Sequence, residues 1–163
     1  MSATFLFAAL VSTACVTATQ DKAITIQTVA GELRVEGRDR SGHCLIVLGG
    51  KTVQRPDCEF SYTPKLLGHF KGGLGTLQEV VVWQERPMGN ACNGGPIHFL
   101  GIRQGGAFRL SGPLDFCGGP DPIVKQDGPK ITVTIPGGSP NKGAGTLATE
   151  VWCYDDGKLV KID

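Results

Sequence analysis

Hydrophobic and polar residues alternate along the chain in short runs, without the longer spacing of an amphipathic helix. The clearest run, residues 131–135, reads Ile-Thr-Val-Thr-Ile, and strict alternation of this kind is typical of a strand buried on one face. By the same criterion, the predicted strands are residues 23–28, 32–36, 43–48, 51–54, 77–84, 96–103, 107–110, 123–126, 130–135, 146–154 and 158–162.

Turn signals separate several of these runs. Gly49-Gly50, residues 126–129 (Gln-Asp-Gly-Pro) and residues 155–157 (Asp-Asp-Gly) favour hairpin turns, and Gln104-Gly105 begins another. The 24 glycines among 163 residues also favour turns over helix interiors. The sequence therefore predicts an all-β fold, an antiparallel sandwich or curled meander of about ten short strands, in a single domain over residues 19–163.

Residues 1–18 are predicted to be a signal peptide with a helical apolar segment. The first ionisable side chain is Asp21, and residues 5–11 read Phe-Leu-Phe-Ala-Ala-Leu-Val. This run is too short for a transmembrane span, which needs about 20 apolar residues. Small residues at 16 and 18 favour cleavage after Ala18. The alternative is a lipobox at residues 12–15, with Ser12 where Leu or Val is usual and lipidation at Cys15.

Charge composition argues against two classes of partner. The chain has 16 Lys and Arg against 15 Asp and Glu, for a formal net charge of +1. Binding to nucleic acid or to an anionic membrane surface requires clustered basic residues. We therefore expect neither nucleic acid nor an anionic membrane surface as a partner. Because the apolar run is too short for a transmembrane span, we expect a periplasmic or secreted protein, with a lipid anchor only if Cys15 is modified.

Four cysteines are predicted to form two disulfides in an oxidising compartment. Cys92 and Cys117 are equidistant from Gln104-Gly105, so a hairpin that turns there with no bulge places them opposite one another. Cys44 and Cys58 flank the turn at Gly49-Gly50 with an offset, and their pairing needs a longer loop or a bulge.

Cys153 remains unpaired in this scheme. It lies in the predicted strand 146–154 and is interpreted as a buried strand residue instead of a nucleophile.

One arrangement of motifs resembles a known group of proteins. Residues 89–92 read Gly-Asn-Ala-Cys, a hairpin follows, Cys117 comes next, and residues 154–157 read Tyr-Asp-Asp-Gly. This arrangement resembles uncharacterised exported β-rich proteins of Gram-negative bacteria, which share a G-N-x-C loop, a hairpin, a second cysteine and a C-terminal Y-x-x-G strand. Residues 75–160 carry the resemblance, whose motifs are structural, so it implies an exported β-rich fold and no established activity.

Residues suited to catalysis or metal binding are sparse. No Cys-x-x-Cys or comparable Cys/His pair occurs, so we expect neither a metal nor another cofactor. His43, His69 and His98 are the candidate bases near neutral pH, but none has a partner at a useful spacing in the sequence. His98 shares a predicted strand face with Leu100 and Ile102, which favours a core histidine over a catalytic one.

The loop around residue 90 is the remaining candidate for function. It is rich in Gly and Asn and is bounded by a tryptophan and by the predicted Cys92 bridge, and loops fixed to a rigid sheet are common binding elements. Arg, Met and Trp are enriched in protein interfaces. The candidate partner-binding residues are Trp83, Arg86, Met88, Asn90 and Asn93. The alternative is that Trp83 belongs to the core and the loop is only a connection.

Three functions fit these observations. The first is a non-enzymatic binding module of the cell envelope, such as an inhibitor or immunity-type partner of a secreted hydrolase. The second is a structural or assembly lipoprotein of the envelope, and the third is an extracytoplasmic hydrolase. We favour the first, with another envelope or secreted protein as the partner.

Overall fold

The computed structural model describes residues 24–36, 41–89, 94–117, 119–139 and 145–163. Within these ranges the chain forms twelve strands in three four-stranded antiparallel sheets. The first sheet contains β1 (Ile24–Thr28), β2 (Gly31–Glu36), β3 (Leu45–Leu48) and β4 (Lys51–Gln54). The middle sheet contains β5 (Ser61–Leu74), β6 (Leu77–Pro87), β7 (Ile97–Arg103) and β8 (Phe108–Leu114). The third sheet contains β9 (Ile123–Asp127), β10 (Lys130–Ile135), β11 (Glu150–Asp155) and β12 (Lys158–Lys161).

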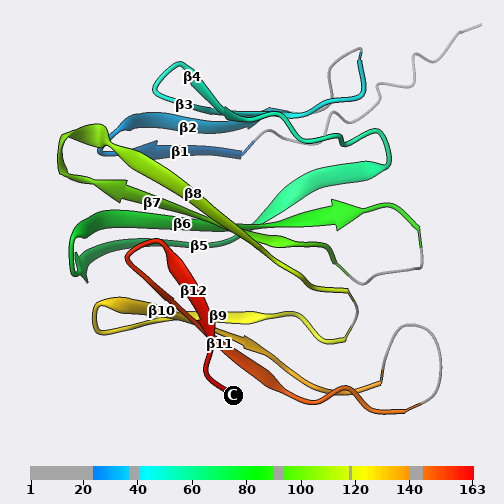
Figure 1. Ribbon diagram of the computed structural model, residues 1–163. Helices are drawn as coiled ribbons and strands as arrows, with labels where there is room; N and C mark the ends of the chain where they lie inside the picture. The colour runs from blue at the N-terminus through cyan, green and yellow to red at the C-terminus, as the bar shows by residue number, and fades with distance from the viewer. Residues whose placement is uncertain (1–23, 37–40, 90–93, 118, 140–144) are drawn as a thin grey trace, which may run out of the picture.

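The three sheets are stacked as three layers, with the middle sheet between the other two (Figure 1). Two hydrophobic cores hold the layers together. Between the first and middle sheets, Leu33 and Ile46 pack with Val81, Trp83 and other buried residues. Between the middle and third sheets, the corresponding residues include Val80, Val82, Phe99, Ile131 and Tyr154. The all-β prediction is confirmed. Successive strand residues point to opposite sides, so the middle sheet contributes to both cores and is buried on both faces.

Each of the eleven predicted runs overlaps one of the observed strands, and β5 is the additional strand. Pro64 and three glycines interrupt the hydrophobic pattern of β5, and its pairing with β6 shifts register at three places. Bulges of this kind break the alternation that sequence analysis depends on. Because β5 is an edge strand of its sheet, it can accommodate Pro64 without losing a hydrogen bond to a second neighbour.

The predicted hairpin turn between β7 and β8 is confirmed, but its register differs from the symmetric one. A short 3-10 turn, Gln104–Gly106, joins the two strands. Leu100 faces Leu110, where the symmetric register would place Arg109, and a further shift between Ile97 and Phe99 brings Ile97 opposite Leu114. The expectation of an unshifted register was therefore wrong, because a β-bulge adds an unpaired residue to one strand.

Several sequence expectations lie outside the described residues. These are the signal helix, its cleavage site and Cys15. Among the residues that the structure does describe, there is no α-helix, and therefore none with the length and apolar character needed to cross a membrane.

Candidate functional site

One face of β6 changes from apolar to polar along the strand, and the candidate site lies at the polar end. Val80 and Val82 are fully buried against the third sheet. Gln84 and Arg86 follow at the same two-residue spacing and so continue that face, where Gln84 is buried and Arg86 is exposed. The polar face therefore begins where β6 leaves the second core.

An open cleft of about 530 Å³ occupies this position. Cross-strand pairing brings Lys65 beside Gln84 and Tyr62 beside Arg86, so β5 and β6 form one wall. Lys65 Nζ donates a hydrogen bond to the Asp121 carboxylate at 2.7 Å, which links the middle sheet to the segment before β9. Pro87, Gly89 and Gly94 complete the lining of the cleft.

Arg86 and Tyr62 are both exposed on this wall. The Arg86 guanidinium lies over the Tyr62 ring, 5.4 Å from its centroid, and Tyr62 is 46% exposed. A cation over an aromatic face is attracted by the ring quadrupole, so the contact holds the guanidinium in place. The Met88 amide donates to the Phe60 carbonyl at 2.6 Å, which places two further exposed side chains beside this pair.

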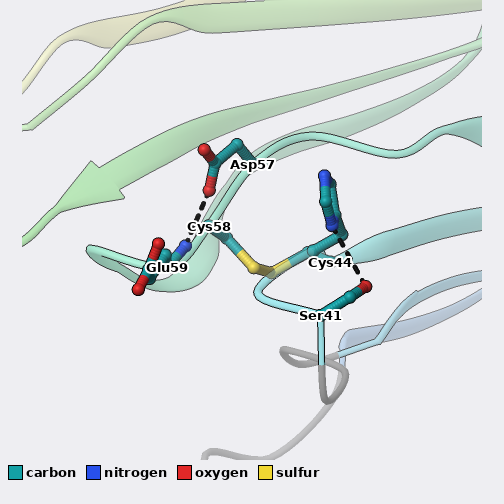
Figure 2. Close-up of a disulfide and its surroundings, with 6 residues drawn as sticks. Ser41, Cys44, Asp57, Cys58 and Glu59 are labelled. Carbon is teal, nitrogen blue, oxygen red and sulfur yellow. Dashed lines mark hydrogen bonds between the residues drawn. A yellow bond between two sulfur atoms is a disulfide. The ribbon is translucent and has the colours of Figure 1, made fainter.

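A disulfide fixes the chain just before β5. Cys44 and Cys58 are bonded, with their Cα atoms 5.8 Å apart, and Figure 2 shows the bridge between the segments that carry Ser41 and Glu59. The register shift between Ile46 and Val47 supplies the bulge that the predicted pairing required. This predicted disulfide is therefore confirmed, and the Ser61 amide, bonded to the Cys58 carbonyl at 3.1 Å, connects it to the start of β5.

The described residues include only one cysteine of the second predicted disulfide. Cys117 is disulfide-bonded, whereas Cys92 lies outside the described residues, so the pairing of these two cysteines stays a prediction. Cys153 is a free thiol on β11 and is only partly buried.

Two histidines have carboxylate partners that the sequence spacing did not reveal. His98 is 4% exposed, stacks on Trp83 with ring centroids 5.5 Å apart, and has its Nε2 atom 2.7 Å from Glu85 Oε1. His69 Nε2 lies 2.9 Å from Glu79 Oε2. The expectation that the histidines lack partners was therefore wrong, because strand pairing joins residues that are distant in sequence.

His98 behaves as the sequence favoured, as a core residue with its polar atom satisfied. Glu79 is 3% exposed and also accepts a hydrogen bond from the Val29 amide at 3.2 Å, which ties the first sheet to the middle one. His43 Nδ1 lies 3.2 Å from Ser41 Oγ, near the disulfide. These contacts account for the histidines as structural residues.

The predicted partner-binding residues are not all on one surface. Arg86 and Met88 are exposed, and Met88 is 43% exposed. Trp83 is 2% exposed and packs in the first core, so it cannot contact a partner as the sequence hypothesis required. Asn90 and Asn93 lie outside the described residues.

Sequence reasoning missed four side chains of the site, which are Tyr62, Lys65, Gln84 and Asp121. Tyr62 and Lys65 belong to the strand that was not predicted. Gln84 was inside a predicted strand, but its cross-strand neighbour was unknown. An available signal was the aromatic pair Phe60 and Tyr62 next to Cys58, which placed large apolar groups close to a predicted disulfide.

Shifted pKa values occur in the third sheet, away from the cleft. A hydrogen bond from Thr76, together with nearby Arg103, lowers the pKa of Asp156. A hydrogen bond from Lys161 likewise lowers the pKa of Glu150, whereas burial raises the pKa of Tyr154. These groups connect strands and turns, so their shifts report structural roles.

Within the described ranges, no three or more His, Cys, Asp or Glu side chains gather in an arrangement that could hold a metal ion. No protein-family model, curated protein or solved structure matches this chain.

Proposed function

We propose that the protein is a non-enzymatic, exported binding module of the cell envelope that recognises another envelope or secreted protein. Its recognition surface, here called the Tyr62 rim, consists of Phe60, Tyr62, Arg86 and Met88. Phe60 is 73% exposed, the largest exposed fraction among the exposed large hydrophobic residues of the described chain. Large apolar side chains that gather at the surface beside an arginine are typical of protein interfaces.

The rigidity of the Tyr62 rim supports this proposal. The Cys44–Cys58 disulfide, the Tyr62–Arg86 strand pair and the hydrogen bond between Met88 and Phe60 hold its backbone on both strands. A surface fixed before binding loses less conformational entropy when a partner docks. The rim therefore has the properties of a preorganised interface, and an inhibitor or immunity-type role toward a secreted hydrolase is the form we favour.

Export rests on the predicted leader and on the disulfide chemistry. Disulfides persist in oxidising compartments, and Cys44, Cys58 and Cys117 are all oxidised in the structure. The lipoprotein alternative depends on Cys15, which lies outside the described residues.

Replacement of Arg86 and Met88 together by Ala tests the function. Affinity capture from an envelope fraction, followed by mass spectrometry, identifies the partner, and its affinity for the purified protein is then measured. We expect the double variant to bind about 1–3 kcal/mol more weakly, because interface arginines and buried apolar contacts carry most binding energy. The thermal midpoint should remain nearly unchanged, since both side chains are exposed.

A matched control replaces Lys51 and Val160 by Ala, which removes one cation and one exposed aliphatic side chain from the first and third sheets. This control should bind normally. Equal affinity of the Arg86/Met88 variant and the control would contradict the proposed function.

A further inference from the structure

The positive charge of Arg86 is not neutralised by the groups around it. Its recorded contact within the described chain is the Tyr62 ring, and no carboxylate in those residues forms an ion pair with it. The contact with the Tyr62 ring uses no hydrogen-bond acceptor, so the N–H groups of the guanidinium remain available to a ligand. A fork of donors held in this way matches the two oxygens of a carboxylate.

The other charged groups of the cleft do not compete for Arg86. Lys65 and Asp121 are bonded to each other at 2.7 Å and together contribute no net charge. Among the described residues that line the cleft, Arg86 therefore carries the one uncompensated charge. Gly89 lines it without a side chain, and no atom of a described residue beyond its chain neighbours lies within 4 Å of where its Cβ would be, so an incoming side chain has room there.

The surroundings of the cleft favour a peptide as the source of the carboxylate. Phe60, Tyr62 and Met88 are exposed next to Arg86 and offer apolar contact on the same rim. An extended protein segment with an acidic residue two positions away from apolar residues would satisfy both features at once, because residues i and i+2 of an extended chain lie on the same side.

We propose that the cleft binds an Asp or Glu side chain of an extended partner segment, with the carboxylate on Arg86 and apolar residues from the same side of the segment on Phe60, Tyr62 and Met88. This inference rests on the proposed function and names the chemistry of the partner segment. Lys65 keeps Asp121 paired, which prevents that carboxylate from repelling the ligand.

The test uses two acetylated and amidated five-residue peptides, Leu-Ser-Glu-Ser-Leu and Leu-Ser-Gln-Ser-Leu, whose Leu and central side chains lie on one side of an extended chain. Affinity is measured for the oxidised protein at low ionic strength, and NMR follows the Arg86 Nε–Hε signal. We expect the Glu peptide to bind about tenfold more tightly and to shift that signal, because charge-assisted bidentate hydrogen bonds outweigh neutral ones. Added salt should reduce the difference between the peptides.

Arg86→Gln and Lys51→Gln each remove one positive charge, so Lys51→Gln is the control. Arg86→Gln should abolish the preference for the Glu peptide, Arg86→Lys should retain only part of it because the fork is lost, and Lys51→Gln should preserve it. The inference would be overturned if the two peptides bound equally or if neither bound. Equal effects of Arg86→Gln and Lys51→Gln would also overturn it. Tighter binding of trigalacturonate than of the Glu peptide would also overturn it, in favour of an acidic sugar.

The same variants separate this inference from the proposed function. If the captured partner binds the Arg86/Met88 variant weakly but the peptides show no acidic preference, the inference fails and the binding function stands. If the partner binds that variant normally, the binding function itself fails.

Discussion

Both faces of the middle sheet bury polar side chains, but the two faces satisfy them differently. On the face toward the first sheet, His98 lies against Glu85 and His69 against Glu79. On the face toward the third sheet, Gln84 is 2% exposed, and its Nε2 atom has no hydrogen-bond partner among the described residues. The first face is closed by paired groups, and the second opens into the cleft.

Long-range pairing explains this difference. The first sheet covers its side of β6 as far as Trp83, and the paired carboxylates supply the acceptors that buried histidines need. The third-sheet core ends at Val82 on β6, so Gln84 lies at the boundary between core and cleft. Most buried polar groups have hydrogen-bond partners, so the unpaired Gln84 Nε2 atom indicates where the core gives way to the cleft.

The largest expected loss of stability comes from removing a paired side chain on the face toward the first sheet. His98→Ala removes a ring stacked on Trp83 and the group that faces Glu85. We expect the free energy of unfolding to fall by about 2–4 kcal/mol, because a cavity and an unmatched carboxylate both remain. Urea denaturation measures this loss. Glu85→Gln keeps an oxygen acceptor near His98 and should cost much less, so equal losses for the two variants would contradict this role for the ring.

On the face toward the third sheet, a substitution should leave the free energy of unfolding unchanged or raise it. Gln84→Leu replaces an amide whose Nε2 atom has no partner in the described chain by an apolar group of similar size. We expect stability to be unchanged or to rise by up to about 1 kcal/mol, since no buried donor is left unsatisfied. Thermal and urea unfolding check this result.

Gln126→Leu is the matched control for this substitution. Gln126 Nε2 donates to the Gly72 carbonyl at 2.9 Å, so its removal should lower stability slightly. If Gln84→Leu is the more destabilising of the two variants, the contrast between the two faces is wrong.

The smallest expected effect is a pH-dependent change in stability at Asp156, in the turn between β11 and β12. Hydrogen bonds from Thr76 and Arg103 lower the pKa of Asp156 in the folded state below its usual value. The stability from this charge is therefore present above the unfolded pKa of about 3.9 and is lost as pH falls through the lower folded pKa. Asp156→Asn should be less stable than the wild type near pH 7 and should approach it in strong acid.

Thermal unfolding from pH 2 to pH 7 tests this expectation. Asn tolerates the positive φ of 43° at this position, so the substitution isolates the charge. Asp127→Asn, in the β9–β10 hairpin, controls for the effect of an Asp-to-Asn change elsewhere in the third sheet. Curves for Asp156→Asn that stay parallel to the wild type would contradict the assigned role.

Part of the fold was predictable because its signals are local. Alternation and turn residues identified eleven of the strands and the main hairpins. The position of the Gly49-Gly50 turn predicted the Cys44–Cys58 disulfide with either a longer loop or a bulge, and the structure has the bulge. These features depend on neighbours within a few residues, and such neighbours leave a pattern in the sequence. The predicted strand boundaries are less accurate, as for β3 and β11, because strand ends depend on which partners continue the ladder.

The sequence by itself determined the all-β class, the hairpins and the core character of His98, since alternation and turn chemistry act over short distances. Only the tertiary structure decided the stacking of three sheets, the burial of Trp83 and the meeting of Tyr62, Arg86, Lys65 and Asp121 around one cleft. The same holds for Gly101, where a Cβ atom would lie 2.5 Å from the Tyr154 hydroxyl of the third sheet. Such contacts join distant segments through bulged registers and layer packing, which alternation along a single chain does not encode.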